Sequence, residues 1–262
     1  LGALAQEAPD APAVTCNEVT LTRAQLDSRS NRLAHELRSH GVGEGSFVTV
    51  AVPNSVDWFV AYVACWKLGA IPQPVSAKLP SRELAAIVEL AGSTVVVGAP
   101  DEAFALLPDS IVHPPLGHEP PPQFTDEALP DAVSPAWKAP TSGGSTGRPK
   151  LIVSGDPALF DTEAPPPLAI IPGGCMLVPG PLYHNGPGVW SCQALLQGNH
   201  VVVLPRFDAE AVLVSIERHR VDVVYLVPTM MKRILRLDDD VRLGYDVSSL
   251  RWVLHTAAPC PE

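Results

Sequence analysis

Thr-Ser-Gly-Gly-Ser-Thr-Gly-Arg-Pro-Lys, at residues 141–150, is the most informative stretch of this chain. Its three glycines, four hydroxyl side chains and two cations suit neither a helix nor a regular strand. They suit a loop around a polyphosphate, because glycines let backbone N–H groups approach an anion, hydroxyls donate hydrogen bonds, and Arg148 and Lys150 neutralise charge. The apolar run at 151–153 predicts a short strand directly after this loop.

A flexible linker is the alternative reading of this stretch, because the preceding segment is rich in proline. Lys150 behind a proline, with an apolar run next, favours the phosphate loop. The stretch is not a Walker loop, which ends in Gly-Lys-Ser/Thr. Here Arg148 and Pro149 separate Gly147 from Lys150, and Leu151 follows the lysine. A kinase or GTPase built on the Walker loop is therefore disfavoured.

The composition indicates a globular protein. The chain has 262 residues, of which 46% are apolar and 18% charged, enough for one large domain or two small ones. Its net charge of −10 argues against nucleic acid or an anionic membrane as the main partner. The longest uninterrupted apolar run, at 58–66, is about half the length of a membrane span. No integral membrane segment is expected.

Five cysteines are scattered along the chain without a C-x-x-C pair. They indicate neither a zinc site nor a disulfide framework, so we expect reduced, mostly buried thiols in a cytoplasmic protein. The first residue is leucine, and the last five residues contain no helix stop. Both features predict that the sequence is a piece of a longer chain.

Helical and strand patterns alternate along most of the sequence. Helices are expected at 24–37, 54–68, 81–91, 189–197, 208–219 and from 229 onward. Thr22 with Gln25 forms a capping-box signature for the first helix, while Asn54 and Asp208 are candidate caps for two others. Strands are expected at 47–52, 70–75, 94–97, 201–204, 221–227 and 251–255. This alternation predicts an α/β fold of mostly parallel sheets layered with helices.

Residues 111–140 interrupt the alternation. Eight of these thirty residues are proline, and no periodicity remains. We expect a long surface connection that leads to the glycine-rich loop. It divides the chain into a first α/β part at 1–110 and a second part at 141–262, which begins with the loop.

Two further segments carry chemistry. Pro-Gly-Pro-Leu-Tyr-His-Asn-Gly-Pro, at 179–187, is rigid and suits the wall of a substrate pocket; a turn before a helix, with His184 on the surface, is the alternative. His-Thr-Ala-Ala-Pro, at 255–259, follows a strand with small residues that allow a flat ring to lie on the backbone; an ordinary strand exit is the alternative. His184 and His255 lack the spacing of a metal-ligand pair, and no Gly-x-Ser-x-Gly elbow occurs.

The three segments, in this order and at these spacings, resemble the adenylate-forming superfamily of acyl-CoA synthetases, amino-acid adenylation domains and luciferases. Residues 142–150 are similar to its phosphate loop, with Gly143 where serine is usual and Leu151 where glycine usually follows the lysine. Residues 181–184 resemble the Pro-Leu-Phe/Tyr-His of CoA ligases, and 256–259 the Gly-Ala-Ala-Pro that lies along adenine. The Lys-x-Gly-Ala segment of the family is similar to residues 67–70.

The resemblance implies the large N-terminal domain of an AMP-forming acid–thiol ligase. Such an enzyme joins a small-molecule carboxylate to ATP with Mg²⁺, releases pyrophosphate, and passes the acyl group to CoA; a homodimer is compatible with it. The wording of the motifs is similar to fatty-acid and bile-acid CoA ligases, so a fatty, aromatic or steroid acid is expected.

The resemblance also assigns roles to residues. The implied nucleotide-binding residues are Ser142, Gly143, Gly144, Ser145, Thr146, Gly147, Lys150, Thr256, Ala257, Ala258 and Pro259. The implied acyl-site residues are Tyr183, His184, Asn185, Gly186 and His255. Lys150 and His184 are the implied catalytic residues, and no metal ligand is assigned within the chain.

The family's Mg²⁺-binding Tyr-Gly-x-Thr-Glu segment, its ribose-binding aspartate and its mobile C-terminal domain are expected after residue 262. We therefore expect residues 1–262 to be inactive alone. Two alternatives stay open: a non-catalytic nucleotide-binding module, and an amino-acid adenylation domain. For the latter, Phe-Asp would be expected in place of His184-Asn185.

Overall fold

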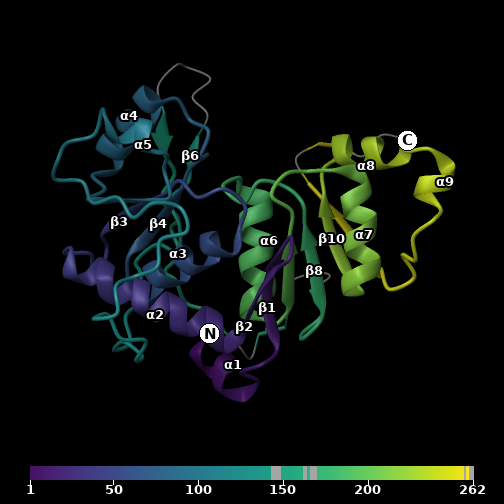
Figure 1. Cartoon of the computed structure of the whole chain (residues 1–262), viewed down its shortest axis with the longest axis horizontal. Helices are drawn as coiled ribbons and strands as arrows, with labels where there is room; N and C mark the ends of the chain where they lie inside the picture. The colour runs from purple at the N-terminus through teal and green to yellow at the C-terminus, as the bar shows by residue number, and fades with distance from the viewer. Residues whose placement is uncertain (143–148, 162–163, 166–169, 257, 260–262) are drawn as a thin grey trace.

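Two sheets with helices packed against them form the framework of the chain (Figure 1). The computed structural model describes residues 1–142, 149–161, 164–165, 170–256 and 258–259. The larger sheet has the strand order β11-β10-β8-β9-β1-β2. Its strands are β1 (Pro12–Cys16), β2 (Val19–Thr22), β8 (Cys175–Val178), β9 (His200–Val203), β10 (Val223–Leu226) and β11 (Trp252–His255). The β1–β2 pair is antiparallel and the other pairs are parallel.

The smaller sheet is wholly parallel, with the order β4-β3-β5. Its strands are β3 (Phe47–Val50), β4 (Ile71–Pro74) and β5 (Val95–Val97). A separate antiparallel ribbon consists of β6 (Thr141–Ser142) and β7 (Lys150–Leu151). The predicted class, mostly parallel sheets layered with helices, is confirmed.

Helices occupy three layers around the two sheets. They are α1 (Gly2–Glu7), α2 (Arg23–Ser39), α3 (Val56–Lys67), α4 (Ser81–Ala91), α5 (Asp101–Phe104), α6 (Asn185–Leu196), α7 (Ala209–His219), α8 (Pro228–Leu235) and α9 (Asp239–Arg242). The central core joins α2, α3 and α6 to one face of each sheet, while α7 covers the outer face of the larger sheet and α4 that of the smaller. No helix among the described residues is long and apolar enough to cross a membrane.

The strands are apolar on both faces because each sheet has helices on both sides. In β8, Met176 and Val178 join the central core, whereas Cys175 and Leu177 join the outer one. This alternation follows from the period of two along a strand. The nearly continuous apolar runs of the sequence are therefore the signature of strands buried on both sides.

Two predicted helix starts are confirmed in detail. The side chain of Thr22 accepts a hydrogen bond from Gln25 N, and the side chain of Gln25 accepts one from Thr22 N, so the capping box of α2 is complete. Asp208 Oδ1 accepts from Ala211 N at 2.9 Å at the start of α7. The four cysteines that the structure describes are buried free thiols, as expected, and Cys260 lies outside the described residues.

Other boundaries were predicted wrongly. Helix α6 begins at Asn185 rather than at residue 189, since Pro187 fits the first turn of a helix. Helix α8 begins one residue before Thr229, with Pro228 at its first position. The strand expected at 151–153 ends at Leu151, and Ile152 and Val153 are 55% and 47% exposed.

The sequence patterns also missed two elements of the larger sheet. One is the β1–β2 hairpin, in which Asn17 turns the chain with a φ of 53°. The other is β8, a four-residue apolar strand before Pro179. Strand β1 pairs with β9, so the first α/β part of the chain contributes to the sheet of the second. The division at 110 and 140 remains a prediction.

Candidate active site

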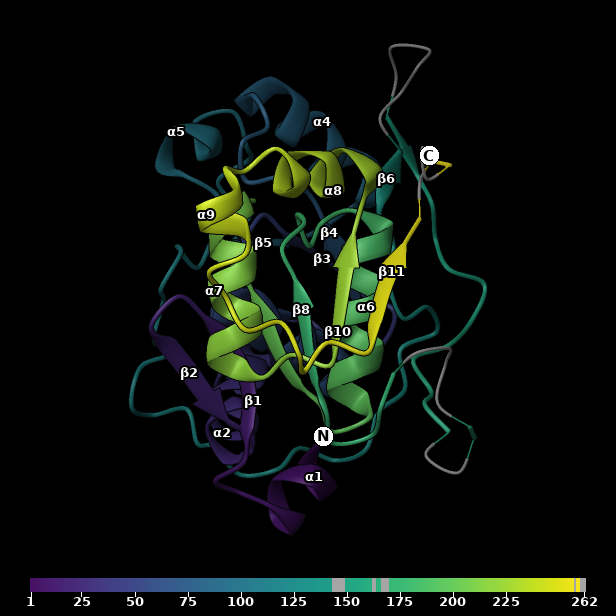
Figure 2. The same ribbon diagram turned by 90° about the vertical axis from the view of Figure 1, so that its right-hand side faces the viewer.

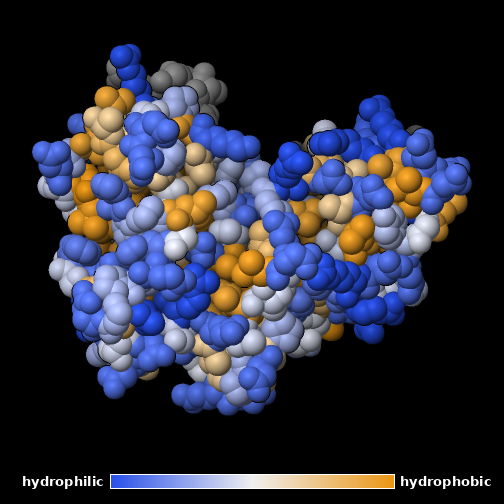
Figure 3. Space-filling view, viewed as in Figure 1, coloured by the Kyte–Doolittle hydropathy of each residue, from blue (hydrophilic) through white to orange (hydrophobic). Residues whose placement is uncertain are grey.

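The carboxyl ends of the parallel strands face one edge of the molecule. Strands β8, β9, β10 and β11 all run in the same direction in the larger sheet. Figure 2 shows β10 and β11 pointing to the upper edge. The ribbon strand β6 lies at the same edge in both ribbon views. The surface is hollowed there, between the part that carries α4 and the part that carries α8 (Figure 3). Ligands of open α/β sheets bind at such edges, which makes this the candidate site.

One side of the site is a wall segment, residues 180–184, held by Asn54. The amide Nδ2 of Asn54 donates to Gly180 O at 2.8 Å and to Leu204 O at 2.9 Å, while its Oδ1 accepts from Leu182 N at 2.8 Å. The prediction that Asn54 caps a helix is wrong: α3 begins after Ser55, and Asn54 instead joins the end of β3 to the segments after β8 and β9. No sequence pattern near Asn54 indicates these partners.

Tyr225 of β10 brings the second and third predicted segments together. Its hydroxyl forms a hydrogen bond with Thr256 Oγ1. The same hydroxyl lies against Gly186, where an added Cβ would approach it to 2.0 Å. Only glycine therefore allows this approach of α6 to the ends of β10 and β11. A tyrosine within an otherwise aliphatic strand was the signal in the sequence, and it was missed.

Tyr183 and His184 lead into α6. Their rings lie 4.3 Å apart between centroids at a tilt of 41°, and His184 is the residue just before the helix. His184 is exposed, yet its neighbours remove enough water to lower the pKa of its imidazole below the usual range. Its ring is therefore neutral at pH 7, and it can accept or donate a hydrogen bond without carrying charge.

The ribbon brings the two ends of the glycine-rich loop together. Ser142 pairs with Lys150 in its register, with Ser142 half-buried and Lys150 exposed. The loop between them, residues 143–148, lies outside the described residues, so the predicted roles of Gly143, Gly144, Ser145, Thr146, Gly147 and Arg148 stay predictions. In the described part of the chain, no hydrogen bond joins Ser142 or Lys150 to the wall segment.

A buried polar network holds the ribbon on the smaller sheet. The hydroxyl of Thr49 donates to Gln73 Oε1 at 2.6 Å and lies 2.8 Å from Ser93 Oγ. The amide of Gln73 in turn donates to Thr141 Oγ1 at 3.3 Å, at the start of the ribbon. Gln73 is fully buried, and a buried amide needs such partners. A glutamine within an apolar strand was the available signal.

Lys138 is a residue that the sequence analysis missed. Its ammonium donates a hydrogen bond to Asn185 Oδ1 at the start of α6. It also lies 4.1 Å from the centroid of the Trp137 ring. Burial lowers the pKa of Lys138 to about 8. A lysine in the proline-rich connection looked like solvated surface charge, and nothing in the pattern distinguished it.

The third predicted segment is open to solvent. His255 and Thr256 are exposed at the end of β11, as are Ala258 and Pro259, while Ala257 lies outside the described residues. Strand β11 is the edge of the larger sheet, and Trp252 and Val253 on it are 57% and 46% exposed. Within the described ranges, no group of three or more His, Cys, Asp or Glu residues could hold a metal ion.

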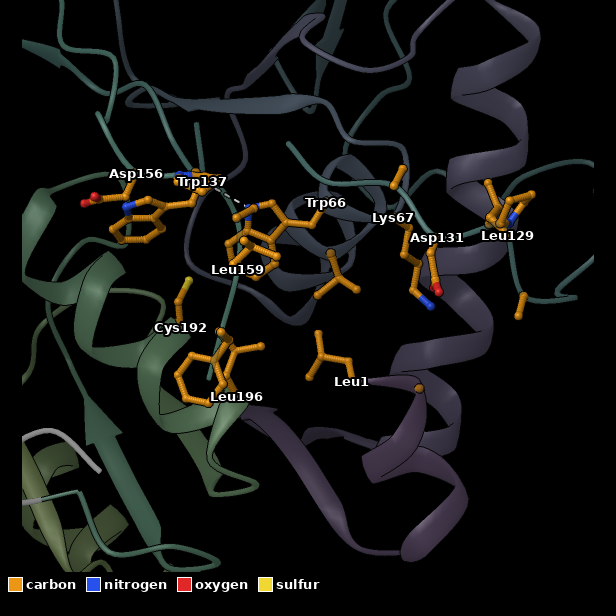
Figure 4. Close-up of a pocket in the computed structure, with 18 of the residues that line it drawn as sticks. Leu1, Trp66, Lys67, Leu129, Asp131, Trp137, Asp156, Leu159, Cys192 and Leu196 are labelled. Atoms are coloured by element: carbon orange, nitrogen blue, oxygen red, sulfur yellow. Dashed lines mark hydrogen bonds between the residues drawn. The ribbon is translucent and has the colours of Figure 1, made fainter. Parts of the chain in front are cut away.

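A further cavity lies elsewhere, at the other end of α6. It measures about 660 Å³ and is bordered by α1, α3, the end of α6 and the segments around 130 and 158 (Figure 4). None of the predicted site residues that the structure describes borders it. Trp137 borders both this cavity and a small one of about 10 Å³ beside Tyr183 and His184, and its carbonyl accepts from Trp66 Nε1 at 2.8 Å. We place the candidate site at the sheet edge, where the polar groups converge.

Comparison with known sequences identifies the family of the chain. A family model described as AMP-binding enzyme matches residues 3–262. Feruloyl-CoA synthase from an Amycolatopsis species is 30% identical over 263 residues, covering 98% of this chain and 53% of that protein. 4-Coumarate–CoA ligase 5 from Oryza sativa subsp. japonica is 31% identical, covering 92% of this chain and 48% of that protein. The chain thus spans about half the length of these curated relatives.

Solved structures share the fold. The inhibitor-bound N-terminal domain of FACL13 from Mycobacterium tuberculosis matches with a TM-score of 0.83 at 22% identity, over 100% of this chain and 69% of that one. The o-succinylbenzoate CoA synthetase MenE from Bacillus subtilis, in complex with its acyl-adenylate intermediate, matches with a TM-score of 0.78 at 22% identity, over 98% and 68%.

Proposed function

We propose, from the premise that the chain belongs to the AMP-binding enzyme family, that it is part of an AMP-forming ligase that joins a carboxylic acid to CoA. The observation that carries the proposal is the meeting of Gly186 and Thr256 at the hydroxyl of Tyr225. It joins a segment suited to an acyl group to a segment suited to a flat ring. An acyl-adenylate carries an acyl group and an adenine ring in one molecule, so the two segments must lie close together to bind it.

The first half-reaction would be attack of the carboxylate on the α-phosphate of ATP, with pyrophosphate as the leaving group. Both reactants are anions, so charge neutralisation and in-line positioning matter more than covalent help. In this proposal Ser142, Ser145, Thr146 and the loop N–H groups hold the β- and γ-phosphates, and Lys150 or Arg148 offsets their charge. The paired ends of the loop at Ser142 and Lys150 support this role.

The wall segment and the first turn of α6 would border the acyl group in the same proposal. Tyr183, His184, Asn185 and Gly186 face the acid, His255 closes its far side, and residues 256–259 lie along adenine. A neutral His184 would contact the carboxylate as a hydrogen-bond partner rather than as a charge.

For the carboxylic acid substrate we propose classes rather than a single compound. The relatives include enzymes named for ferulate, 4-coumarate and hydroxybenzoate as well as long-chain fatty acids. Aromatic acids are therefore the first class to test, followed by fatty and steroid acids. The acyl group would then pass from AMP to the thiol of CoA.

Pyrophosphate release tests the proposal. The complete gene product that contains this chain should release pyrophosphate from ATP only when a suitable carboxylic acid is present, and should form the acyl-CoA when CoA is added. Release without an acid, or no release with any aromatic, fatty or steroid acid, would contradict the ligase. Residues 1–262 alone should form no acyl-hydroxamate at a comparable rate.

A further inference from the structure

Lys138 is a half-buried cation beside the start of α6. Its Nζ donates to the side-chain oxygen of Asn185, and Tyr183 and His184 border the same small cavity. The ring of Trp137 lies under the ammonium at 4.1 Å. Lys138 thus faces the part of the site in which the proposed acid would lie.

Among the residues that the structure describes, no carboxylate is a partner of Lys138. In the described part of the chain, no Asp or Glu oxygen lies within 4.0 Å of its ammonium. The lysine Lys67 makes an instructive contrast, because its Nζ contacts Asp27 Oδ1 and Asn31 Oδ1 at 2.6 Å each. Both lysines are partly buried, but of the two only Lys67 has its charge balanced by a carboxylate of the described residues. A desolvated cation without a counter-charge is costly, and such groups are found where a ligand supplies the charge.

The surroundings of Lys138 suit an organic acid better than a phosphate. The ring of Trp137 lies under the ammonium of Lys138, and Tyr183 borders the same small cavity. Asn185 is the first residue of a twelve-residue helix, whose amino-terminal end favours negative charge. Lys138 also lies before the ribbon that leads to the glycine-rich loop, since this ribbon begins at Thr141. It is therefore outside the segment proposed to hold the phosphates.

We propose that Lys138 and Asn185 form a carboxylate-binding pair in the acyl site, with the ammonium of Lys138 binding an oxygen of the reacting carboxylate. This inference rests on the proposed function. It adds Lys138, a binding residue that lies outside the three segments identified in the sequence. The amide of Asn185 orients the ammonium, and its own NH₂ remains to donate to the second carboxylate oxygen.

The binding pair should depend on pH. Tyr62 of α3, Cys192 of α6, and Tyr183 and His184 of the wall segment are the titratable groups near Lys138. Burial raises the pKa of Cys192 to about 12 and that of Tyr62 well above its usual value, whereas it lowers the pKa of His184. Cys192 and Tyr62 therefore stay protonated and His184 stays neutral from pH 7 to pH 9. Lys138, with a pKa of about 8, loses its charge in this range, so carboxylate affinity is present below pH 8 and is lost above it.

The experiment compares Lys138→Met and Lys138→Arg in the complete gene product, with benzoate, ferulate and decanoate as acids. Lys138→Met should raise the KM of every accepted acid by roughly 10- to 100-fold and leave the KM of ATP within about twofold. Lys138→Arg should retain part of the affinity, and the loss of acid affinity above pH 8 should disappear in Lys138→Met. Arg38→Met, which removes an exposed cation in the last turn of α2, is the matched control and should change neither KM.

Three outcomes would overturn the inference. They are an unchanged acid KM in Lys138→Met, an equal rise in the KM of ATP, and a rise in acid KM confined to ferulate. The last result would mean that Lys138 binds an oxygen of ferulate outside its carboxylate. If the unmodified protein releases no pyrophosphate with any acid, the proposed function fails instead. The pair is then judged by thermal shift: benzoate and decanoate should stabilise the unmodified protein at pH 7 but not at pH 9.5, and should not stabilise Lys138→Met at either pH.

Discussion

The wall segment and the ribbon lie at the same edge of the molecule, but they are held in very different ways. Asn54 ties the wall segment with two hydrogen bonds and joins it to Leu204 after β9 with a third. Leu182 within the wall segment is buried, and Tyr225 closes against the first turn of α6. The ribbon has two residues in each strand and an exposed Lys150, and among the described residues its side-chain hydrogen bond is the one from Gln73 to Thr141 at its base. The wall segment proposed to border the acyl group is therefore held by several buried contacts, whereas the ribbon proposed to lead into the phosphate loop is held by the Gln73 hydrogen bond and by the packing of Leu151.

This contrast predicts that changes to the wall segment cost stability, whereas changes to the ribbon cost ligand affinity. The largest effect is expected for Asn54→Ala. It leaves two carbonyls and one N–H without their partner, and at about 1 kcal/mol each the free energy of unfolding should fall by about 3 kcal/mol. Urea unfolding measures this loss.

Asn185→Ala is the matched control for stability, since Asn185 is an exposed asparagine at a helix start. Its free energy of unfolding should fall by less than about 1 kcal/mol. Similar losses in the two variants would mean that Asn54 does not hold the wall segment, and the contrast between wall and ribbon would then disappear.

Gly186→Ala should have the next largest effect. Its new Cβ would approach the Tyr225 hydroxyl to 2.0 Å, so helix α6 or Tyr225 must move, at a cost of about 2 kcal/mol in the free energy of unfolding. Adding Tyr225→Phe removes the oxygen and should recover part of this loss, which a double-mutant cycle measures. Gly155→Ala is the control, because nothing lies within 4 Å of its Cβ position. Equal losses at Gly186 and Gly155 would exclude the close approach.

Local patterns predicted the parts of the fold that depend on neighbours in sequence. The capping box of α2 and the Asp208 cap of α7 involve partners three residues away, and both are confirmed. The hairpin β1–β2 was missed because its place in the sheet depends on β9, almost two hundred residues later. Its turn, Asn17-Glu18, also lacks the glycine that most clearly marks a two-residue hairpin.

The site was predicted in the same uneven way. The sequence identified the three segments, and Gly186 and Thr256 do lie together. It could not identify Asn54, whose partners are the backbone groups of residues 180, 182 and 204, because backbone groups leave no trace in the sequence. Lys138 was missed for another reason. Its proposed binding role depends on its burial and on the lack of a nearby carboxylate among the described residues, and a local sequence pattern records neither.

Lys150→Ala examines the ribbon side of the contrast. Because Lys150 is exposed, its removal should change the free energy of unfolding by less than about 0.5 kcal/mol. In the complete gene product the KM of ATP should rise about tenfold, which corresponds to about 1.4 kcal/mol of lost phosphate interaction. Arg38→Ala, in the last turn of α2, is the control for a lost exposed cation. Unchanged ATP kinetics in Lys150→Ala would remove the phosphate role from this residue.

Thr141→Val should have the smallest effect, and it separates the two kinds of support most finely. The substitution keeps the shape of the side chain but removes the acceptor of Gln73 Nε2, a single hydrogen bond of 3.3 Å worth about 1 kcal/mol or less. Because Gln73 is fully buried, the lost bond should loosen the ribbon rather than the sheet, so the KM of ATP should rise about threefold while the KM of the acid stays unchanged. Thr141→Ser keeps the hydroxyl and should behave as the unmodified protein does. If Thr141→Val instead raises the KM of the acid as much as that of ATP, the ribbon and the wall segment are coupled, and the rigid side of the site extends further than these hydrogen bonds indicate.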